Sequence, residues 1–130
     1  MQEKLVFEYA VLRIVPRVER EEFINVGIVL YCPKKKFLRS QYQLDEKRIT
    51  AFAPKLDIEE IRGYLQAFTA ICDGSPQGGP IARLTQPERF RWLTAMRSTI
   101  LQTSRVHPGL LTDPDEKLQR LFEEIVEVRE

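Results

Sequence analysis

The chain has 130 residues and a net charge of +1, with 43% hydrophobic and 30% charged residues. This length suits one compact domain, and the composition is typical of a globular protein rather than a disordered or fibrous one. No apolar run approaches the roughly 20 residues that span a bilayer, and the first residues lack the layout of a signal peptide. We therefore expect a single cytoplasmic domain over residues 1–130.

Apolar runs predict three strands at the start of the chain. Val6–Val15 is rich in β-branched and aromatic residues and stops at Pro16. Phe23–Cys32 follows a polar connection, and Phe37–Leu44 follows the turn Pro33–Lys36. Three strands with short connections favour an antiparallel meander.

The next part of the chain reads as helical. Asp45 can cap a short helix that stops at Pro54, and Asp57 can cap a longer helix with apolar residues at helical spacing. The stretch 73–80 is rich in glycine and proline, so we expect a loop there, the most flexible segment of the chain. Thr85 resembles the N-cap of a third helix, which should turn Phe90, Leu93 and Met96 inward.

The last third of the chain predicts a strand and a closing helix. Thr99–Val106 is β-prone and should return to the sheet as a fourth strand that ends at Pro108-Gly109. Asp113-Pro114 opens a helix with one apolar stripe, made of Leu118, Leu121, Phe122, Ile125 and Val128. The fold class is therefore α+β: an antiparallel sheet of three to four strands, an N-terminal meander plus a later strand, packed against three to four helices.

Charge is unevenly distributed along the chain. Residues 81–109 hold five arginines and one acid, a net charge of +4, whereas residues 110–130 hold seven acids and three bases, a net charge of −4. The two segments could neutralise each other within the fold, which is the simpler interpretation, or could present a basic patch beside an acidic helix.

The sequence offers little for metal or covalent chemistry. Cys32 and Cys72 end apolar segments and are expected to be small core residues. His107 is the single histidine and no metal-ligand spacing is present, so we expect no metal and no cofactor. Ser98 lies nine residues before His107 without a nucleophile-elbow motif, which gives a hydrolase interpretation little weight and leaves enzymatic activity undecided.

A polar group could gather on one face of the predicted sheet. Alternation places Ile24, Val26, Ile28, Leu30 and Cys32 toward the helices, and Asn25 and Gly27 on the opposite face. Tyr9 and Arg13 of the first strand would project to the same side. A phenol, a guanidinium and an amide around a glycine would suit an anionic ligand.

Arg97 and Ser98 form a second polar cluster, which completes the candidate site. A structural alternative is favoured for the strand residues, because buried polar groups usually satisfy one another. In that alternative Asn25 bonds backbone groups of the connecting loop, Arg13 pairs with Glu21 or Glu22, and Gly27 marks a bulge.

Several segments resemble one family. Phe7–Pro16 and Arg20–Leu30 look like the start of the bacterial domain-of-unknown-function family numbered 3037, and Glu88–Leu93, Arg97–Ser104 and Leu118–Phe122 resemble its later parts. The matching positions are Tyr9, Arg13, Pro16, Glu21, Asn25, Gly27, Arg97, Ser98, Gln102 and Ser104. The resemblance implies small bacterial proteins with no assigned activity, loosely associated with kinases that resemble the HipA toxin.

Two main functional hypotheses follow. The first is an accessory or regulatory protein-interaction module, with a HipA-like kinase as the partner that the resemblance suggests and with a homodimer left open. The second is a small-ligand or enzymatic domain with an anion site around Arg13, Asn25 and Arg97. Nucleic-acid binding by basic residues such as Lys34–Lys36 is weaker, and no membrane association is expected.

Overall fold

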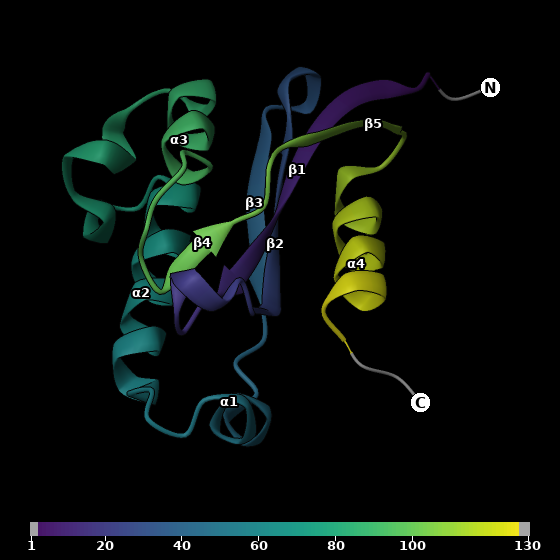
Figure 1. The fold of residues 1–130 in the computed structure, drawn as a ribbon. Coiled ribbons are helices and arrows are strands. Elements are labelled where there is room, and N and C mark those ends of the chain that lie inside the picture. Colours follow the sequence, from purple (N-terminus) through teal and green to yellow (C-terminus); the bar gives the residue numbers. More distant parts are fainter. Residues whose placement is uncertain (1–2, 128–130) are drawn as a thin grey trace.

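The computed structural model describes residues 3–127 and shows an antiparallel sheet with helices on both faces (Figure 1). Met1, Gln2 and Val128, the last residue of the predicted apolar stripe, lie outside the described residues. The meander is confirmed: β1 (Leu5–Ile14), β2 (Ile24–Cys32) and β3 (Phe37–Tyr42) pair in sequence. The 3₁₀ turns η1 (Val18–Arg20) and η2 (Pro33–Lys35) connect them.

The sheet has five strands, one more than the sequence predicted. Both β4 (Leu101–Thr103) and β5 (His107–Leu111) pair with β1, one after the other along the same edge, so the order is β3-β2-β1-β4 with β5 beside β1. Pro108 and Gly109 were expected to end a strand but lie within β5. An edge strand tolerates proline because its outer side needs no N–H group.

Caps place the α-helices as the sequence predicted. Asp45 precedes α1 (Glu46–Phe52), and Asp57 precedes α2 (Ile58–Asp73). The Asp57 carboxylate accepts from two backbone N–H groups of the first turn of α2, which satisfies donors that a helix start leaves free. Asp113 does the same for α4 (Pro114–Ile125).

Two expectations in the middle of the chain were wrong. The stretch predicted as a loop leads into η3 (Pro76–Arg83), a 3₁₀ segment interrupted at Gly79, where φ is +70°. This segment packs tightly on α2, because a Cβ at Gly78 would lie 3.1 Å from the backbone of Ala70. The third helix, α3 (Gln86–Leu93), ends before Met96, whose side chain is 90% exposed rather than turned inward.

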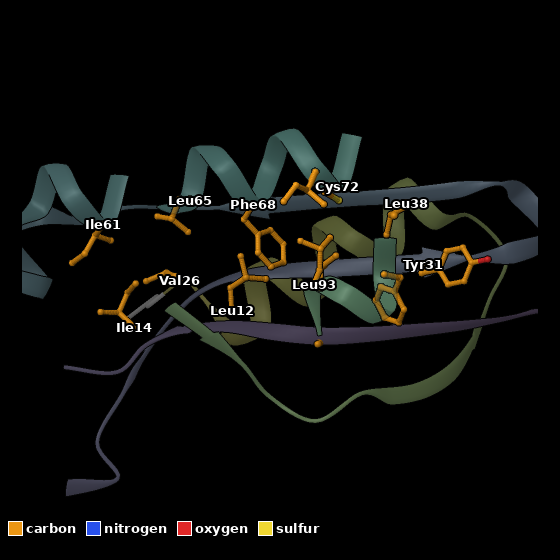
Figure 2. Close-up of a cluster of buried hydrophobic side chains, with 14 of the residues drawn as sticks. Leu12, Ile14, Val26, Tyr31, Leu38, Ile61, Leu65, Phe68, Cys72 and Leu93 are labelled. Atoms are coloured by element: carbon orange, nitrogen blue, oxygen red, sulfur yellow. The ribbon is translucent and has the colours of Figure 1, made fainter. Parts of the chain in front are cut away.

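Each face of the sheet has its own core. On one face α2 and α3 bury the larger cluster, in which Ile61, Leu65, Phe68 and Cys72 of α2 point at the strands (Figure 2). On the other face α4 buries Leu118, Leu121 and Phe122 against the sheet. Both cysteines are buried, as expected.

A bulge in β2 divides its apolar residues between the two cores. Leu12 is opposite Gly27 and Arg13 is opposite Asn25, so Val26 is an extra residue in the ladder. One extra residue inverts the alternation of side chains beyond it. Val26 therefore faces α2, whereas Ile28, Leu30 and Cys32 face α4, and the prediction of one continuous apolar face was wrong.

Within residues 3–127, no helix is both long and apolar enough to cross a membrane.

Candidate functional site

Arg13 and Asn25 lie directly opposite each other on β1 and β2, on the α4 face of the sheet. The Arg13 guanidinium lies 4.1 Å from the centroid of the Phe23 ring, and burial lowers the pKa of Arg13. The predicted pairing of Arg13 with Glu21 or Glu22 does not form among the described residues, and Glu22 pairs with Arg20. Arg13 Nε and Asn25 Oδ1 are both buried without a hydrogen-bond partner in the described structure.

The other two strand residues of the predicted group lie elsewhere. Gly27 is on the α2 face because of the bulge, and a Cβ there would lie 2.7 Å from the Gln41 carbonyl oxygen. The space beside this glycine is therefore filled by β3 and cannot admit a ligand, whereas its expected place at a bulge is confirmed. Tyr9 is four residues from Arg13, roughly 13 Å along a strand, and its ring lies 5.2 Å from that of His107.

Arg97 and Ser98 lie on the opposite side of the sheet from Arg13. The Arg97 guanidinium stacks on the ring of Trp92 at 4.1 Å and donates to the carbonyl oxygens of Trp92 and Leu93 at the end of α3. Cations are favoured at helix C-termini, where carbonyl groups lack partners within the helix. Ser98 is exposed in the following loop. The structure thus keeps Arg13 beside Asn25 and places Tyr9, Gly27 and the neighbouring Arg97 and Ser98 apart from them.

Arg97 belongs to the wall of an open, mainly apolar hollow of about 240 Å³. We call it the α2–β4 groove, and it is defined by Tyr64, Phe68, Ile71, Trp92, Arg97 and Leu101. Residues 64, 68 and 71 lie on one face of α2, because positions three and four apart are neighbours on a helix. The loop from α3 to β4 forms the opposite wall.

Large side chains stand partly exposed around this groove. Tyr64 is 41% exposed and Trp92 is 39% exposed, and the largely exposed Met96 lies between the lining residues Ala95 and Arg97. The Tyr64 hydroxyl donates to the carboxylate of Glu60 at 2.5 Å, and this hydrogen bond raises the pKa of Tyr64. Tyrosine, tryptophan, methionine and arginine are enriched where proteins bind other proteins.

Two further polar residues of the resemblance have structural roles. The Ser104 hydroxyl accepts from the Val11 N–H at 2.9 Å, while the Ser104 N–H donates to the Val11 carbonyl oxygen at 2.8 Å. Ser104 therefore binds β1 in the short gap between β4 and β5, which pair with β1 one after the other. The Gln102 amide donates to the carbonyl oxygen of Thr99 and shapes the preceding loop.

The sequence did not single out Tyr64, and it did not predict that Met96 is exposed. Tyr64 lies beside the buried stripe of α2 and extends it toward solvent, as an amphipathic pattern alone could have indicated. Met96 had no such signal, because its exposure depends on where α3 ends.

The basic segment 81–109 contains α3, and the acidic segment 110–130 contains α4. α3 packs on the face of the sheet opposite to α4 (Figure 1). Asp115 of α4 pairs with Arg39 of β3, and Glu116 pairs with Arg120 of α4 itself. These two acidic side chains thus find their partners outside residues 81–109, which the simpler expectation of mutual neutralisation did not foresee.

Comparison with protein families identifies the family of this chain. The model of the family described as "Protein of unknown function (DUF3037)" matches residues 9–126, so the chain belongs to this family. No curated protein and no solved structure matches the chain significantly.

Proposed function

We propose that this protein is an accessory or regulatory module that binds a partner protein through the α2–β4 groove. The observation that carries the proposal is the pair of partly exposed aromatic residues, Tyr64 and Trp92, in the wall of an apolar hollow, with the largely exposed Met96 next to two lining residues in the sequence. Binding energy in protein interfaces concentrates in such aromatic anchors, which lie in pockets that exclude water.

The size of the groove also supports a protein partner. Small-molecule sites usually enclose about 300–1,000 Å³ and bury most of the ligand. The α2–β4 groove is smaller, about 240 Å³, and open to solvent. Its dimensions suit one or two inserted side chains of a partner better than an enclosed ligand.

The first candidate partner is a kinase that resembles the HipA toxin, from the same genome. The test is a titration of this kinase with the wild-type protein and with Tyr64→Ala and Met96→Ala variants. Truncation of an anchor is expected to weaken binding by more than about tenfold. Leu110→Ala is the matched control, because Leu110 is equally apolar and 57% exposed but lies on β5, outside the groove.

Equal weakening by Leu110→Ala would place the contact elsewhere on the surface. Absence of binding to the kinase would remove this candidate partner.

A second candidate function is a small-ligand site at Arg13 and Asn25. It is favoured by the buried Arg13 Nε and Asn25 Oδ1, which have no hydrogen-bond partner among the described residues. Buried polar atoms normally have partners, and a ligand with a donor and an acceptor could supply them. Calorimetry with inorganic phosphate tests it: binding that Arg13→Ala abolishes, with an unchanged thermal midpoint, would support the site, and no heat of binding would count against an anion there.

A further inference from the structure

We infer that the α2–β4 groove recognises an acidic peptide segment of the partner, in which an apolar side chain enters the groove and a neighbouring aspartate or glutamate binds Arg97. The inference rests on the proposed function and adds the chemistry of the partner. Among the described residues that line the groove, Arg97 carries the one charge.

Arg97 is held in position before any partner arrives. Its guanidinium stacks on the Trp92 ring at 4.1 Å, and it donates to two carbonyl oxygens of the last turn of α3. A guanidinium has five N–H donors in a fixed plane. Two are used by these carbonyl groups, so three remain for a carboxylate.

The fixed orientation favours binding. A side chain that is already ordered loses less conformational entropy when a partner binds. A planar guanidinium also matches the geometry of a carboxylate, with which it can form two parallel hydrogen bonds. Arg97 is therefore suited to bind a carboxylate in one defined geometry, which is more specific than a general attraction between opposite charges.

The sequence segment that contains Arg97 is basic as a whole. Residues 81–109, which include α3 and β4, carry a net charge of +4. Arg91 and Arg105 of this segment are both exposed. Exposed arginines of this segment speed the approach of an acidic peptide, whereas Glu60, which accepts from the Tyr64 hydroxyl beside the groove, opposes it. The preference for a carboxylate therefore rests on Arg97 itself.

The experiment begins with a displayed library of random peptides, selected on the full-length wild-type protein. Selected sequences are synthesised with blocked termini, so that any carboxylate comes from a side chain. Binding is followed by the fluorescence of Trp92, which is the single tryptophan of the chain and lies in the groove wall. We expect the selected peptides to share an aromatic or aliphatic residue close to Asp or Glu.

A double-mutant cycle then tests the pairing. Replacing the peptide Asp by Asn, or Glu by Gln, is expected to weaken binding to the wild-type protein by about tenfold, the scale of a hydrogen bond to a charged group. The same replacement should have no effect on binding to Arg97→Gln. Arg105→Gln is the matched control and should behave like the wild type, since Arg105 lies outside the groove.

Three alternative outcomes would each contradict a specific claim. An equal loss in the wild type and in Arg97→Gln would show that Arg97 does not bind the carboxylate, while the groove could still be the binding site. An equal effect of Arg105→Gln would show unspecific attraction. Selected peptides whose binding is unchanged in Tyr64→Ala and Met96→Ala would contradict the proposed function itself.

Discussion

Ser104 shows how one polar side chain can hold two strand pairings together. Its hydroxyl accepts from the Val11 N–H and donates to the Arg105 carbonyl oxygen, both at 2.9 Å. Val11 and Ser104 are buried, so neither group has water as a substitute partner. The resemblance marked this serine, and the structure gives it a role in folding.

Ser104→Ala should destabilise the protein by about 1–3 kcal/mol, because the buried Val11 N–H loses its acceptor. Chemical denaturation measures the change. Ser98→Ala is the control, since Ser98 is exposed, and should change stability by less than about 0.5 kcal/mol. A neutral Ser104→Ala would mean that another acceptor replaces the hydroxyl.

The two thiols are protected by burial. Cys32 and Cys72 are both free and buried, and burial raises the pKa of Cys72 to about 12. The thiolate is the reactive form, so a buried thiol of high pKa reacts slowly. With a thiol-reactive dye, we expect almost no labelling of the native protein and labelling of both thiols after unfolding. Rapid labelling of Cys72 in the native state would contradict the described packing.

At the scale of elements, Gly27 lets β3 approach β2 closely beside the bulge. A Cβ at this position would lie 2.7 Å from a backbone oxygen of β3. A Cβ at Gly63, which is exposed in the middle of α2, would meet nothing within 4 Å. Replacement by alanine is therefore expected to change stability in opposite directions at the two positions.

Gly27→Ala should lower the free energy of unfolding by about 1–3 kcal/mol through overpacking against β3. Gly63→Ala should raise it by about 0.5–1 kcal/mol, because alanine loses less backbone freedom in a helix. Thermal or urea unfolding of both variants checks the pair. A tolerated Gly27→Ala would show that β3 can move away.

The start of α3 should respond to acid. The Glu88 carboxylate accepts from the Thr85 hydroxyl at 2.7 Å and from the Thr85 N–H at 3.4 Å, which lowers the pKa of Glu88. Because the pKa of Glu88 is lower in the folded state, the ionised carboxylate stabilises the folded protein at pH values above its usual pKa of 4.5. This stabilisation is lost as the pH falls through the lowered pKa.

Glu88→Gln should therefore be less stable than the wild type at neutral pH, and the difference should vanish in strong acid. Urea unfolding of both proteins across this pH range measures it. A difference that persists below the lowered pKa would mean that the charge of Glu88 is not its cause.

Elements with local signals could be predicted from the sequence, whereas pairings between distant residues could not. Asp45, Asp57 and Asp113 are caps that act within one helical turn, and each was found from its neighbours in the chain. The bulge at Val26 depends on the register between β1 and β2. Strict alternation contains no such extra residue, so it wrongly placed Asn25 and Gly27 on one face.

The candidate site shows the same limit. Arg97 was found from its polar neighbours, but its partner Trp92 and the wall residue Tyr64 come from different elements. Their meeting depends on α2 packing beside the end of α3. No spacing within the sequence encodes that contact directly.

At the scale of the whole molecule, the sheet separates two surfaces. α4 covers one face, and α2 and α3 lie on the other (Figure 1). α4 carries Asp115 and Glu116, whereas the groove with Arg97 lies beside α2 and α3. The predicted grouping of Arg13 with Arg97 fails for this reason. Each surface can now be tested independently of the other.

Amide chemical-shift mapping during titration with a selected acidic peptide tests the central claim most directly. We expect the perturbed signals to cluster in residues 64–71 and 92–103, with a shift of the Trp92 indole N–H. Shifts concentrated around Arg13 and Asn25, or along α4, would contradict it. In that case the α2–β4 groove would not be the binding surface of this protein.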